Sequence, residues 1–348
     1  MRAIVVHSAK DLRLDQQPET SPGPGQVAIK VRAGGICGSD LHYFNNGGFG
    51  AIRIKEPMIL GHEVSGEIAS IGEGVEGLAV GNRVAINPSL PCLQCEYCQL
   101  GQHNHCLDMR FYGSAMRFPH VQGAFSERLI CEARQCVVLP QATDFHLAAF
   151  AEPLSVALHG INRIAEVGQG LSGKRVLVSG CGPIGALAIM AARHSGAMEI
   201  VAVDVADHVL SVASTVGADH TVNVANNTSA LKQFEGGRGY FDVVIEASGT
   251  ESALHSAIQL IRPRGVLMQL GLGGDVTIPI NTCVSKEIAL IGTFRFHEEF
   301  NWAAQLIGQG VLDLSPLLSA AIPMESAAEA FALAGDRSQA VKVQIAFN

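Results

Sequence analysis

The sequence predicts an α/β protein in which a β-rich, barrel-like domain accompanies a doubly wound parallel sheet. The first hundred residues hold short β-rich runs separated by glycine and proline, which is typical of an all-β domain. From Lys174 onward, strands alternate with helical stretches, as in a parallel sheet with helices on both faces. A chain of 348 residues also exceeds what one hydrophobic core usually fills. We therefore expect two domains.

The β-rich domain is expected to contain both ends of the chain. Its predicted strands cover residues 2–6, 26–33, 67–71 and 83–86. The run Pro22-Gly-Pro-Gly25 marks a turn before the second of them. Residues 342–347 form a β-like run that could rejoin this domain, because the strand–helix rhythm stops at about Gly292.

The predicted parallel sheet is made of near-continuously apolar strands. They cover residues 175–179, 199–204, 242–247 and 265–270, and a helix is expected over residues 182–195. Strands that are buried on both faces read as apolar runs rather than as alternating ones. This pattern favours a sheet that is covered by helices on each side.

A Gly-x-Gly-x-x-Gly run lies directly between the first of these strands and the helix. Gly180 permits the tight turn, Gly182 lets the backbone approach a pyrophosphate, and Gly185 allows close helix–strand packing. The next strand ends in Asp204, nineteen residues past Gly185, where the ribose-binding carboxylate of a dinucleotide site belongs. The expected cofactor-binding residues are Gly180, Gly182, Pro183, Ile184, Gly185 and Asp204.

The end of the second strand also indicates which dinucleotide is used. Asp204 would repel a 2′-phosphate, and residues 205–208 supply no arginine to receive one. NAD is therefore favoured over NADP. The alternative for Asp204 is a solvated residue at a strand end.

Four of the nine cysteines fall within fifteen residues, as Cys92, Cys95, Cys98 and Cys106. Thiolates at this spacing can converge on one tetrahedral zinc, which then has no open position for chemistry. Disulfide pairing is an alternative, but we expect no signal peptide and the other cysteines are scattered, as in a reduced cytosol. An iron–sulfur cluster is disfavoured by the seven-residue spacer before Cys106. We predict a structural zinc.

Composition and charge exclude several classes of function. The net charge is −8 and no block of lysine or arginine stands out, so a nucleic-acid partner is not expected. The one long uncharged stretch, residues 176–192, is interrupted by glycine and proline and ends at Arg193. It is too short to span a membrane. We expect a cytoplasmic protein with neither a nucleic-acid nor a membrane partner.

A second metal site is indicated by three separate segments. Cys37, His62, Glu63 and Glu152 together offer a thiolate, an imidazole and two carboxylates. A catalytic zinc needs about three protein ligands and an open position. Taken singly, each residue has an ordinary structural explanation, namely a small buried cysteine, a hydrogen-bonded core histidine or a solvated glutamate.

These segments, the cysteine cluster and the glycine motif occur in an order and spacing that resemble the zinc-dependent medium-chain dehydrogenases, in particular the polyol dehydrogenase group. The resemblance covers essentially the whole chain. Within the group, the sequence is most similar to the L-idonate 5-dehydrogenases. That likeness is carried by residues 34–43, 87–89, 108–116, 118–121 and 294–296.

The resemblance implies a GroES-like catalytic domain that is interrupted in sequence by a Rossmann domain. The catalytic domain would comprise residues 1–153 and 292–348, with its zinc lobe at about 88–110. The NAD-binding Rossmann domain would comprise residues 154–291. Two zinc ions per chain are implied, one catalytic and one structural.

The resemblance also implies a role for individual residues. Cys37, His62 and Glu63 match the catalytic zinc ligands, and Glu152 matches a carboxylate that binds zinc directly or through water. Asp40 resembles the carboxylate that orients the zinc-bound histidine, a role with its own physical rationale because such partners fix the tautomer and the ring orientation. The implied catalytic residues are Ser39 and His42, as a proton relay, with Glu63 and Glu152.

The implied reaction transfers a hydride from a secondary hydroxyl to NAD, with L-idonate oxidised to 5-ketogluconate. Idonate carries a carboxylate, and arginine offers it a bidentate fork. We expect Arg110, Arg117 and Arg295 near the substrate, together with Tyr43. The alternative for the arginines is pairing with acidic residues or facing solvent.

Other functions remain open at this point. A sorbitol or xylitol dehydrogenase is the first alternative and a threonine dehydrogenase the second. A catalytically silent binding protein on the same fold is the alternative from another class. The resemblance further implies a homotetramer or homodimer that pairs through edge strands of the nucleotide domain. Residues 274–280 are a candidate edge strand, although they could equally form a surface loop.

Overall fold

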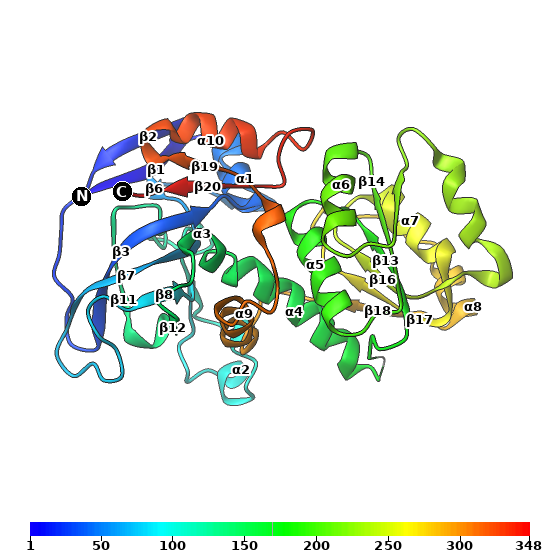
Figure 1. Cartoon of the computed structure of the whole chain (residues 1–348), viewed down its shortest axis with the longest axis horizontal. Coiled ribbons are helices and arrows are strands. Elements are labelled where there is room, and N and C mark those ends of the chain that lie inside the picture. The colour runs from blue at the N-terminus through cyan, green and yellow to red at the C-terminus, as the bar shows by residue number, and fades with distance from the viewer. Residues whose placement is uncertain (169) are drawn as a thin grey trace. The chain divides into compact units, whose positions relative to one another are not determined.

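The computed structural model describes residues 1–168 and 170–348, which divide into two compact units. Unit 1 comprises Met1–Glu152, Phe300–Asp336 and Lys342–Asn348. Unit 2 comprises Pro153–Glu299 and Arg337–Val341. Figure 1 shows the elements of both units, coloured along the chain.

The largest sheet of unit 1 has seven strands. Its strands are β3 (Gln26–Gly35), β7 (Glu63–Ile71), β8 (Arg83–Ile86), β11 (Arg128–Glu132), β12 (Cys136–Leu139), β19 (Leu318–Pro323) and β20 (Lys342–Ala346). They run in the order β12-β8-β7-β3-β20-β19, and β11 also pairs with β3. The antiparallel pairing of β20 with β3 confirms that the C-terminal run rejoins the β-rich domain.

Smaller elements complete unit 1. Its other strands are β1 (Arg2–Ser8), β2 (Asp11–Gln16), β4 (Gly48–Phe49), β5 (Ile52–Arg53), β6 (Met58–Ile59), β9 (Ser89–Leu90) and β10 (Arg110–Phe111). Its helices are α1 (Gly38–Asn46), α2 (Glu96–Gln99), α3 (Phe145–Ala148) and α10 (Ala327–Ala334), with 3₁₀ turns at His103–His105, Ala133–Gln135, Ser315–Leu317 and Met324–Ser326. Helices α4 (Ala151–Glu166) and α9 (Glu299–Gly308) include residues of both units.

Unit 2 is built on a six-stranded sheet in which every pair is parallel. The strands are β13 (Arg175–Ser179), β14 (Glu199–Asp204), β15 (His220–Asn223), β16 (Phe241–Glu246), β17 (Ile261–Gln269) and β18 (Ala289–Gly292). The helices are α5 (Pro183–His194), α6 (Asp207–Thr215), α7 (Glu251–Leu260) and α8 (Ile280–Lys286), with 3₁₀ turns at Thr228–Phe234 and Gly236–Arg238. Helices lie on both sides of the sheet (Figure 1).

Burial explains why the strands of this sheet are apolar at successive positions. Val176, Leu177 and Val178 of β13 are all buried, although alternate residues of a strand point to opposite faces. Leu177 belongs to a core cluster with Leu254 and Ile258 of α7. Both faces of the sheet are therefore covered, as the sequence pattern predicts.

The strand order positions a ligand site in unit 2. The strand order is β15-β14-β13-β16-β17-β18. From β13 the chain adds β14 and β15 on one side, and it then crosses to add β16, β17 and β18 on the other, so the order reverses between β13 and β16. In open α/β sheets, ligands bind outside the carboxyl ends of the strands at such a reversal. The chain leaves these ends at Gly180, after β13, and at Ala247, after β16.

The candidate edge strand at residues 274–280 is not a strand. Residues 274–279 form a loop, and α8 begins at Ile280. The described sheet ends at β15 on one side and at β18, which pairs with β17, on the other. In the part of the chain that the structure describes, no helix combines the length and apolarity needed to cross a membrane.

Candidate active site and metal centres

The pairing of two strands brings three potential metal ligands together in unit 1. Gly35, at the end of β3, lies opposite Glu63, at the start of β7. Cys37 follows β3 by two residues, and His62 directly precedes β7. One ligand atom from each of Cys37, His62 and Glu63 lies within 4.8 Å of the others. The structure therefore groups three of the four residues that the sequence indicates.

Gly35 makes room for this group. A Cβ atom at this position would lie 2.0 Å from Oε2 of Glu63, well inside the distance that two non-bonded atoms tolerate. Any larger residue would displace the Glu63 carboxylate from its place beside Cys37. A glycine at position 35 is thus explained, because it leaves space for the side chain of Glu63 on the neighbouring strand.

Asp40 connects the two segments that carry the ligands. Its Oδ2 accepts a hydrogen bond from the Cys37 N–H at 2.9 Å, and its Oδ1 accepts one from the Gly61 N–H at 3.0 Å. The same Oδ1 lies 3.9 Å from Nδ1 of His62, an atom that is buried and has no hydrogen-bond partner among the described residues. Because Nδ1 faces Asp40, Nε2 is the nitrogen left to bind a metal.

Lys342 supplies a buried positive charge to the same site. Its Nζ donates hydrogen bonds to both carboxylate oxygens of Glu63, at 2.7 and 2.8 Å, and to the carbonyl of Ile36 at 3.1 Å. Burial alone would lower the pKa of Lys342, but Glu63 and then Cys37 outweigh it and raise the pKa. The ammonium therefore stays charged, with all three of its protons donated.

Buried acidic groups outnumber this cation. Glu152 is buried, and its pKa is raised to about 8, first by burial and then by Glu63 and Cys37, whereas His62 acts in the opposite direction. Burial and Glu63 likewise raise the pKa of Cys37 to about 11. Such an excess of thiol and carboxyl groups fits a divalent cation, and a cysteine–histidine–carboxylate set suits zinc. Glu152 itself lies outside the group of three ligand atoms.

The four clustered cysteines form a second group with different geometry. Sγ of Cys92 lies 4.0 Å from that of Cys98, and Sγ of Cys95 lies 4.0 Å from that of Cys106. Four sulfurs at zinc–thiolate distance around a tetrahedral ion are roughly 3.8 Å apart. Backbone N–H groups of Cys92 and Asp108 also donate to Cys106 Sγ, at 3.2 and 3.4 Å. The loop fits a closed structural zinc site.

The glycine motif in unit 2 has the geometry of a phosphate-binding turn. Gly180 has a φ of +89°, and a Cβ atom at Gly185 would lie 1.7 Å from the Gly180 carbonyl oxygen. In contrast, beyond the adjacent residues of the chain, no described atom lies within 4 Å of a Cβ built at Gly182. That open position, one residue before α5, is the place where a pyrophosphate can approach the backbone.

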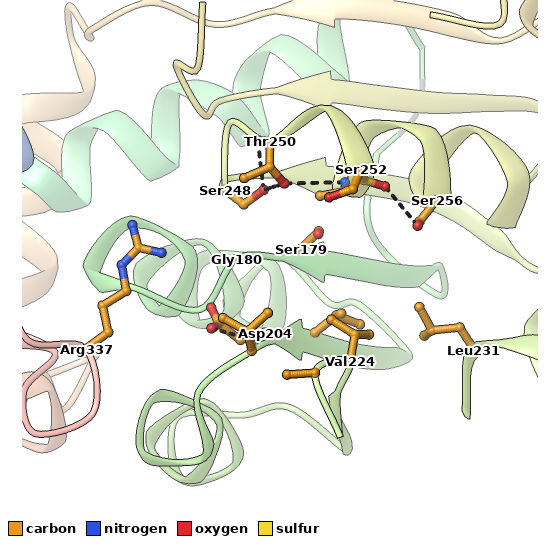
Figure 2. A pocket seen from close by; sticks show the side chains of 14 residues that line it. Ser179, Gly180, Asp204, Val224, Leu231, Ser248, Thr250, Ser252, Ser256 and Arg337 are labelled. Carbon is orange, nitrogen blue, oxygen red and sulfur yellow. Dashed lines mark hydrogen bonds between the residues drawn. The ribbon is translucent and has the colours of Figure 1, made fainter. Parts of the chain in front are cut away.

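A cavity of about 390 Å³ extends from this turn across the ends of β13 and β14 (Figure 2). It is lined by Ser179, Gly180, Val203, Asp204, Val205, Val224, Ala225, Leu231, Ser248, Thr250, Ser252, Ala253, Ser256 and Arg337. The carboxylate of Asp204 accepts backbone hydrogen bonds from Cys181 at 2.7 Å, Val205 at 2.7 Å and Ala206 at 3.1 Å. Its place at the end of β14 is the one that a ribose-binding carboxylate requires.

Two family models match the chain. The model described as "Alcohol dehydrogenase GroES-like domain" matches residues 23–141, and the one described as "Zinc-binding dehydrogenase" matches residues 183–309. An "L-idonate 5-dehydrogenase (NAD(P)(+))" from Escherichia coli K12 is 46% identical over 347 residues, 99% of this chain and 98% of the relative. The chain belongs to the zinc-binding dehydrogenase family.

Other similarities agree with this assignment. A sorbitol dehydrogenase from Gallus gallus is 35% identical, with 99% of this chain and 95% of the relative covered. The crystal structure of L-idonate 5-dehydrogenase from E. coli aligns with a TM-score of 0.93 at 43% identity, over 99% of this chain and 98% of that one. A zinc-binding dehydrogenase from Sinorhizobium meliloti 1021, bound to NADP, aligns with a TM-score of 0.88 at 27% identity, over 99% and 98%.

These findings confirm several predictions. The dehydrogenase combines a GroES-like domain with a Rossmann-type sheet, and it is an oxidoreductase of CH–OH groups whose cofactors are zinc and a nicotinamide dinucleotide. They favour an enzyme over the catalytically silent alternative.

The remaining predicted residues occupy varied environments. Ser39 and His42 lie on α1, where Ser39 is partly buried and His42 is exposed. Tyr43 is buried, and its hydroxyl accepts a hydrogen bond from the Ala115 N–H at 2.9 Å. Arg110 is exposed on β10, whereas Arg117 pairs with the carboxylate of Asp108.

Arg295 belongs to unit 2, and its guanidinium stacks on the ring of Phe294 with 4.9 Å between its carbon and the ring centroid. The structure also reveals two groups that the sequence did not indicate. One is Lys342, which pairs with Glu63, and the other is Arg337, which lines the 390 Å³ cavity of unit 2. A lysine within the apolar run 342–347 was the available signal for the first.

Proposed function

We propose that the dehydrogenase oxidises a secondary hydroxyl of a sugar acid with NAD, and that L-idonate, converted to 5-ketogluconate, is its substrate. The observation that carries the substrate class is the 46% identity, over nearly the full length, to a relative named L-idonate 5-dehydrogenase. The Cys37, His62 and Glu63 group, of which His62 and Glu63 are buried, supports zinc-dependent chemistry of this kind.

Cys37, His62 and Glu63 would hold the catalytic zinc, with Glu152 binding directly or through water. When bound there, zinc acts as a Lewis acid that lowers the pKa of the substrate hydroxyl. Asp40 would orient the His62 ring from its Nδ1 side, and Lys342 would hold the Glu63 carboxylate in place.

Ser39 and His42 would carry the hydroxyl proton to solvent. They are three residues apart on α1 and therefore share one face of the helix. Ser39 is partly buried beside Cys37, whereas His42 is exposed, so the two side chains mark the inner and outer ends of such a route. The hydride would leave the carbon that bears this hydroxyl for the nicotinamide ring, and the loss of the proton and the hydride together balances the oxidation to a ketone.

The dinucleotide would lie against the turn formed by Gly180, Gly182, Pro183, Ile184 and Gly185. Its adenosine ribose would donate to Asp204, whose backbone hydrogen bonds hold the carboxylate in a single orientation. The carboxylate also repels a 2′-phosphate, which supports a preference for NAD.

A neutral polyol is the second candidate substrate. Arg117 already pairs with Asp108, and the Tyr43 hydroxyl is buried and hydrogen-bonded to Ala115. Among the described residues of unit 1 that were predicted to bind substrate, Arg110 is then the one exposed cation. Sorbitol dehydrogenases at 35% identity make sorbitol or xylitol the natural comparison.

NAD reduction by the zinc-loaded protein separates these candidates. L-idonate, D-gluconate, sorbitol, xylitol and L-threonine are compared side by side. The proposal expects L-idonate to have the highest kcat/KM, and Arg110→Gln to raise its KM while leaving that of xylitol unchanged. Arg53→Gln, an exposed arginine whose guanidinium donates to backbone carbonyls, serves as the charge-matched control. Faster turnover of a polyol would replace the sugar acid and leave the zinc chemistry in place.

We also propose that the dehydrogenase assembles as a homodimer or homotetramer through the β18 edge. The strand has no further partner in the described sheet, and Leu290 on it is exposed. Val284 and Ile280 of the neighbouring α8 are exposed as well. Apolar side chains beside an open strand edge favour pairing with a second copy.

Light scattering during size exclusion tests the assembly. Val284→Lys is expected to shift the mass toward that of one chain, whereas Val80→Lys, at a similarly exposed valine of unit 1, is not. A wild-type protein that elutes as a monomer at micromolar concentration would contradict the proposal.

A further inference from the structure

Arg337 joins the dinucleotide pocket from a distant part of the sequence. The segment Arg337–Val341 packs with unit 2, although the residues on either side of it belong to unit 1. Arg337 lines the 390 Å³ cavity together with Gly180 and Asp204. This arginine lies far outside residues 205–208, which directly follow Asp204 and contain no arginine.

The charge of Arg337 has no partner in the described protein. Its side chain is exposed to the cavity, and no hydrogen bond or ion pair engages its guanidinium within residues 1–168 and 170–348. The other charged lining residue, Asp204, is instead satisfied by the N–H groups of Cys181, Val205 and Ala206. Arg337 is thus the one cationic side chain of the lining and is free to bind an anion.

The position of Arg337 suits a phosphate group of a dinucleotide. In Figure 2 its guanidinium lies on the Gly180 side of the pocket, away from Val224 and Leu231. The apolar Val224 and Leu231 suit a planar ring, while the Gly180 turn suits a phosphate. A guanidinium on the Gly180 side can bind two oxygens of a phosphate through two parallel hydrogen bonds.

We infer that Arg337 is a phosphate-binding residue of the cofactor site. The inference rests on the proposal that this pocket holds the dinucleotide. Two phosphates of a nicotinamide dinucleotide share the required chemistry, namely the pyrophosphate common to NAD and NADP and the 2′-phosphate found on NADP alone. If Arg337 binds the pyrophosphate, it would increase the affinity for NAD and for NADP equally. Binding to the 2′-phosphate would offset the repulsion from Asp204 and admit NADP.

Calorimetric titration measures binding directly, without turnover. The protein is titrated with ADP-ribose, which carries only the pyrophosphate, and with adenosine 2′-monophosphate, which carries only the 2′-phosphate. NADH and NADPH complete the series. The variants are Arg337→Gln and the conservative Arg337→Lys. Arg264→Gln is the charge-matched control, because Arg264 is an exposed arginine of unit 2 that lies outside the pocket lining and pairs with Glu287.

Arg337→Gln is expected to raise the Kd of the affected ligands roughly 10- to 100-fold, the size of a hydrogen bond to a charged group. Arg337→Lys should restore part of the loss. Weakening of ADP-ribose, NADH and NADPH together assigns the contact to the pyrophosphate. Weakening of adenosine 2′-monophosphate and NADPH alone assigns it to the 2′-phosphate.

Two results would overturn the inference, and only the second would also contradict the assignment of the pocket to the dinucleotide. If Arg337→Gln changes no Kd more than Arg264→Gln does, Arg337 does not bind phosphate and the dinucleotide pocket stands. If the wild-type protein binds none of the four ligands, the pocket itself is not the dinucleotide site and the proposed function loses its cofactor assignment.

Discussion

Replacement of Lys342 by methionine tests whether the buried ion pair beside the metal ligands stabilises unit 1. The lysine is 2% exposed and Glu63 is 1% exposed, so neither charge is screened by solvent. Methionine fills most of the volume of the lysine stem but removes the three hydrogen bonds of Nζ. The Glu63 carboxylate is then left buried without its cation.

The size of the effect follows from this burial. Removing one partner of a buried ion pair destabilises a protein by about 3–5 kcal/mol, because the remaining charge is uncompensated. For a unit of roughly 150–250 residues, each kcal/mol shifts Tm by about 2–4 °C. We therefore expect Lys342→Met to lower the Tm of the unit by roughly 6–20 °C.

Differential scanning calorimetry of the purified variants provides the measurement. Arg13→Met is the control, because the ion pair between Arg13 and Asp11 lies at the surface of the same unit and should shift Tm little. The double variant Lys342→Met with Glu63→Gln should have a Tm closer to that of the wild type than Lys342→Met alone has, because the unpaired carboxylate charge is gone. If Lys342→Met shifts Tm no more than Arg13→Met, the ion pair is not a stabilising feature of the site.

Three further predictions concern other parts of the structure. Gly185→Ala should abolish NADH binding in a fluorescence titration, because its Cβ would lie 1.7 Å from the Gly180 carbonyl, whereas Gly292→Ala, which meets no described atom within 4 Å, should bind normally. Asp40→Asn should weaken zinc binding at the Cys37 site about 10- to 100-fold in a competition titration with a chelating dye, and unchanged affinity would refute its orienting role. Hydrogen bonds, first of them that from His159, outweigh burial and hold the pKa of Glu299 at about 2, below its ordinary 4.5. This group therefore contributes about 3 kcal/mol above pH 4.5 that is lost as the pH falls toward 2, so the Tm difference between wild type and Glu299→Gln should shrink over that range and not elsewhere.

Local signals in the sequence were sufficient for much of the Rossmann sheet. The strands at residues 175–179 and 199–204 have the predicted bounds, because each apolar run ends at a glycine or a capping carboxylate. The helix after Gly182 was equally clear, since the glycine turn and Pro183 mark its start. In contrast, β17 begins at Ile261 rather than at residue 265, because the strand continues through Pro263 and Arg264 with a shift of register.

The contacts that complete both sites were not predictable from local patterns. Lys342 meets Glu63 across 279 positions of sequence, through the pairing of β20 with β3. Arg337 reaches the pocket because a five-residue segment near the C-terminus packs with unit 2. Residues 274–280 carried a β-like composition, but no strand in the described sheet pairs with them. Each of these depends on the packing of distant segments.

The zinc content of the Cys37→Ser protein tests the central claim most directly. The claim is that the Cys37, His62 and Glu63 group holds a zinc ion separate from the one in the cysteine cluster. Mass spectrometry of metals should find two zinc ions per chain in the wild type and one in Cys37→Ser. Cys95→Ser should also retain one, from the other site. A Cys37→Ser protein that keeps two zinc ions would contradict the account.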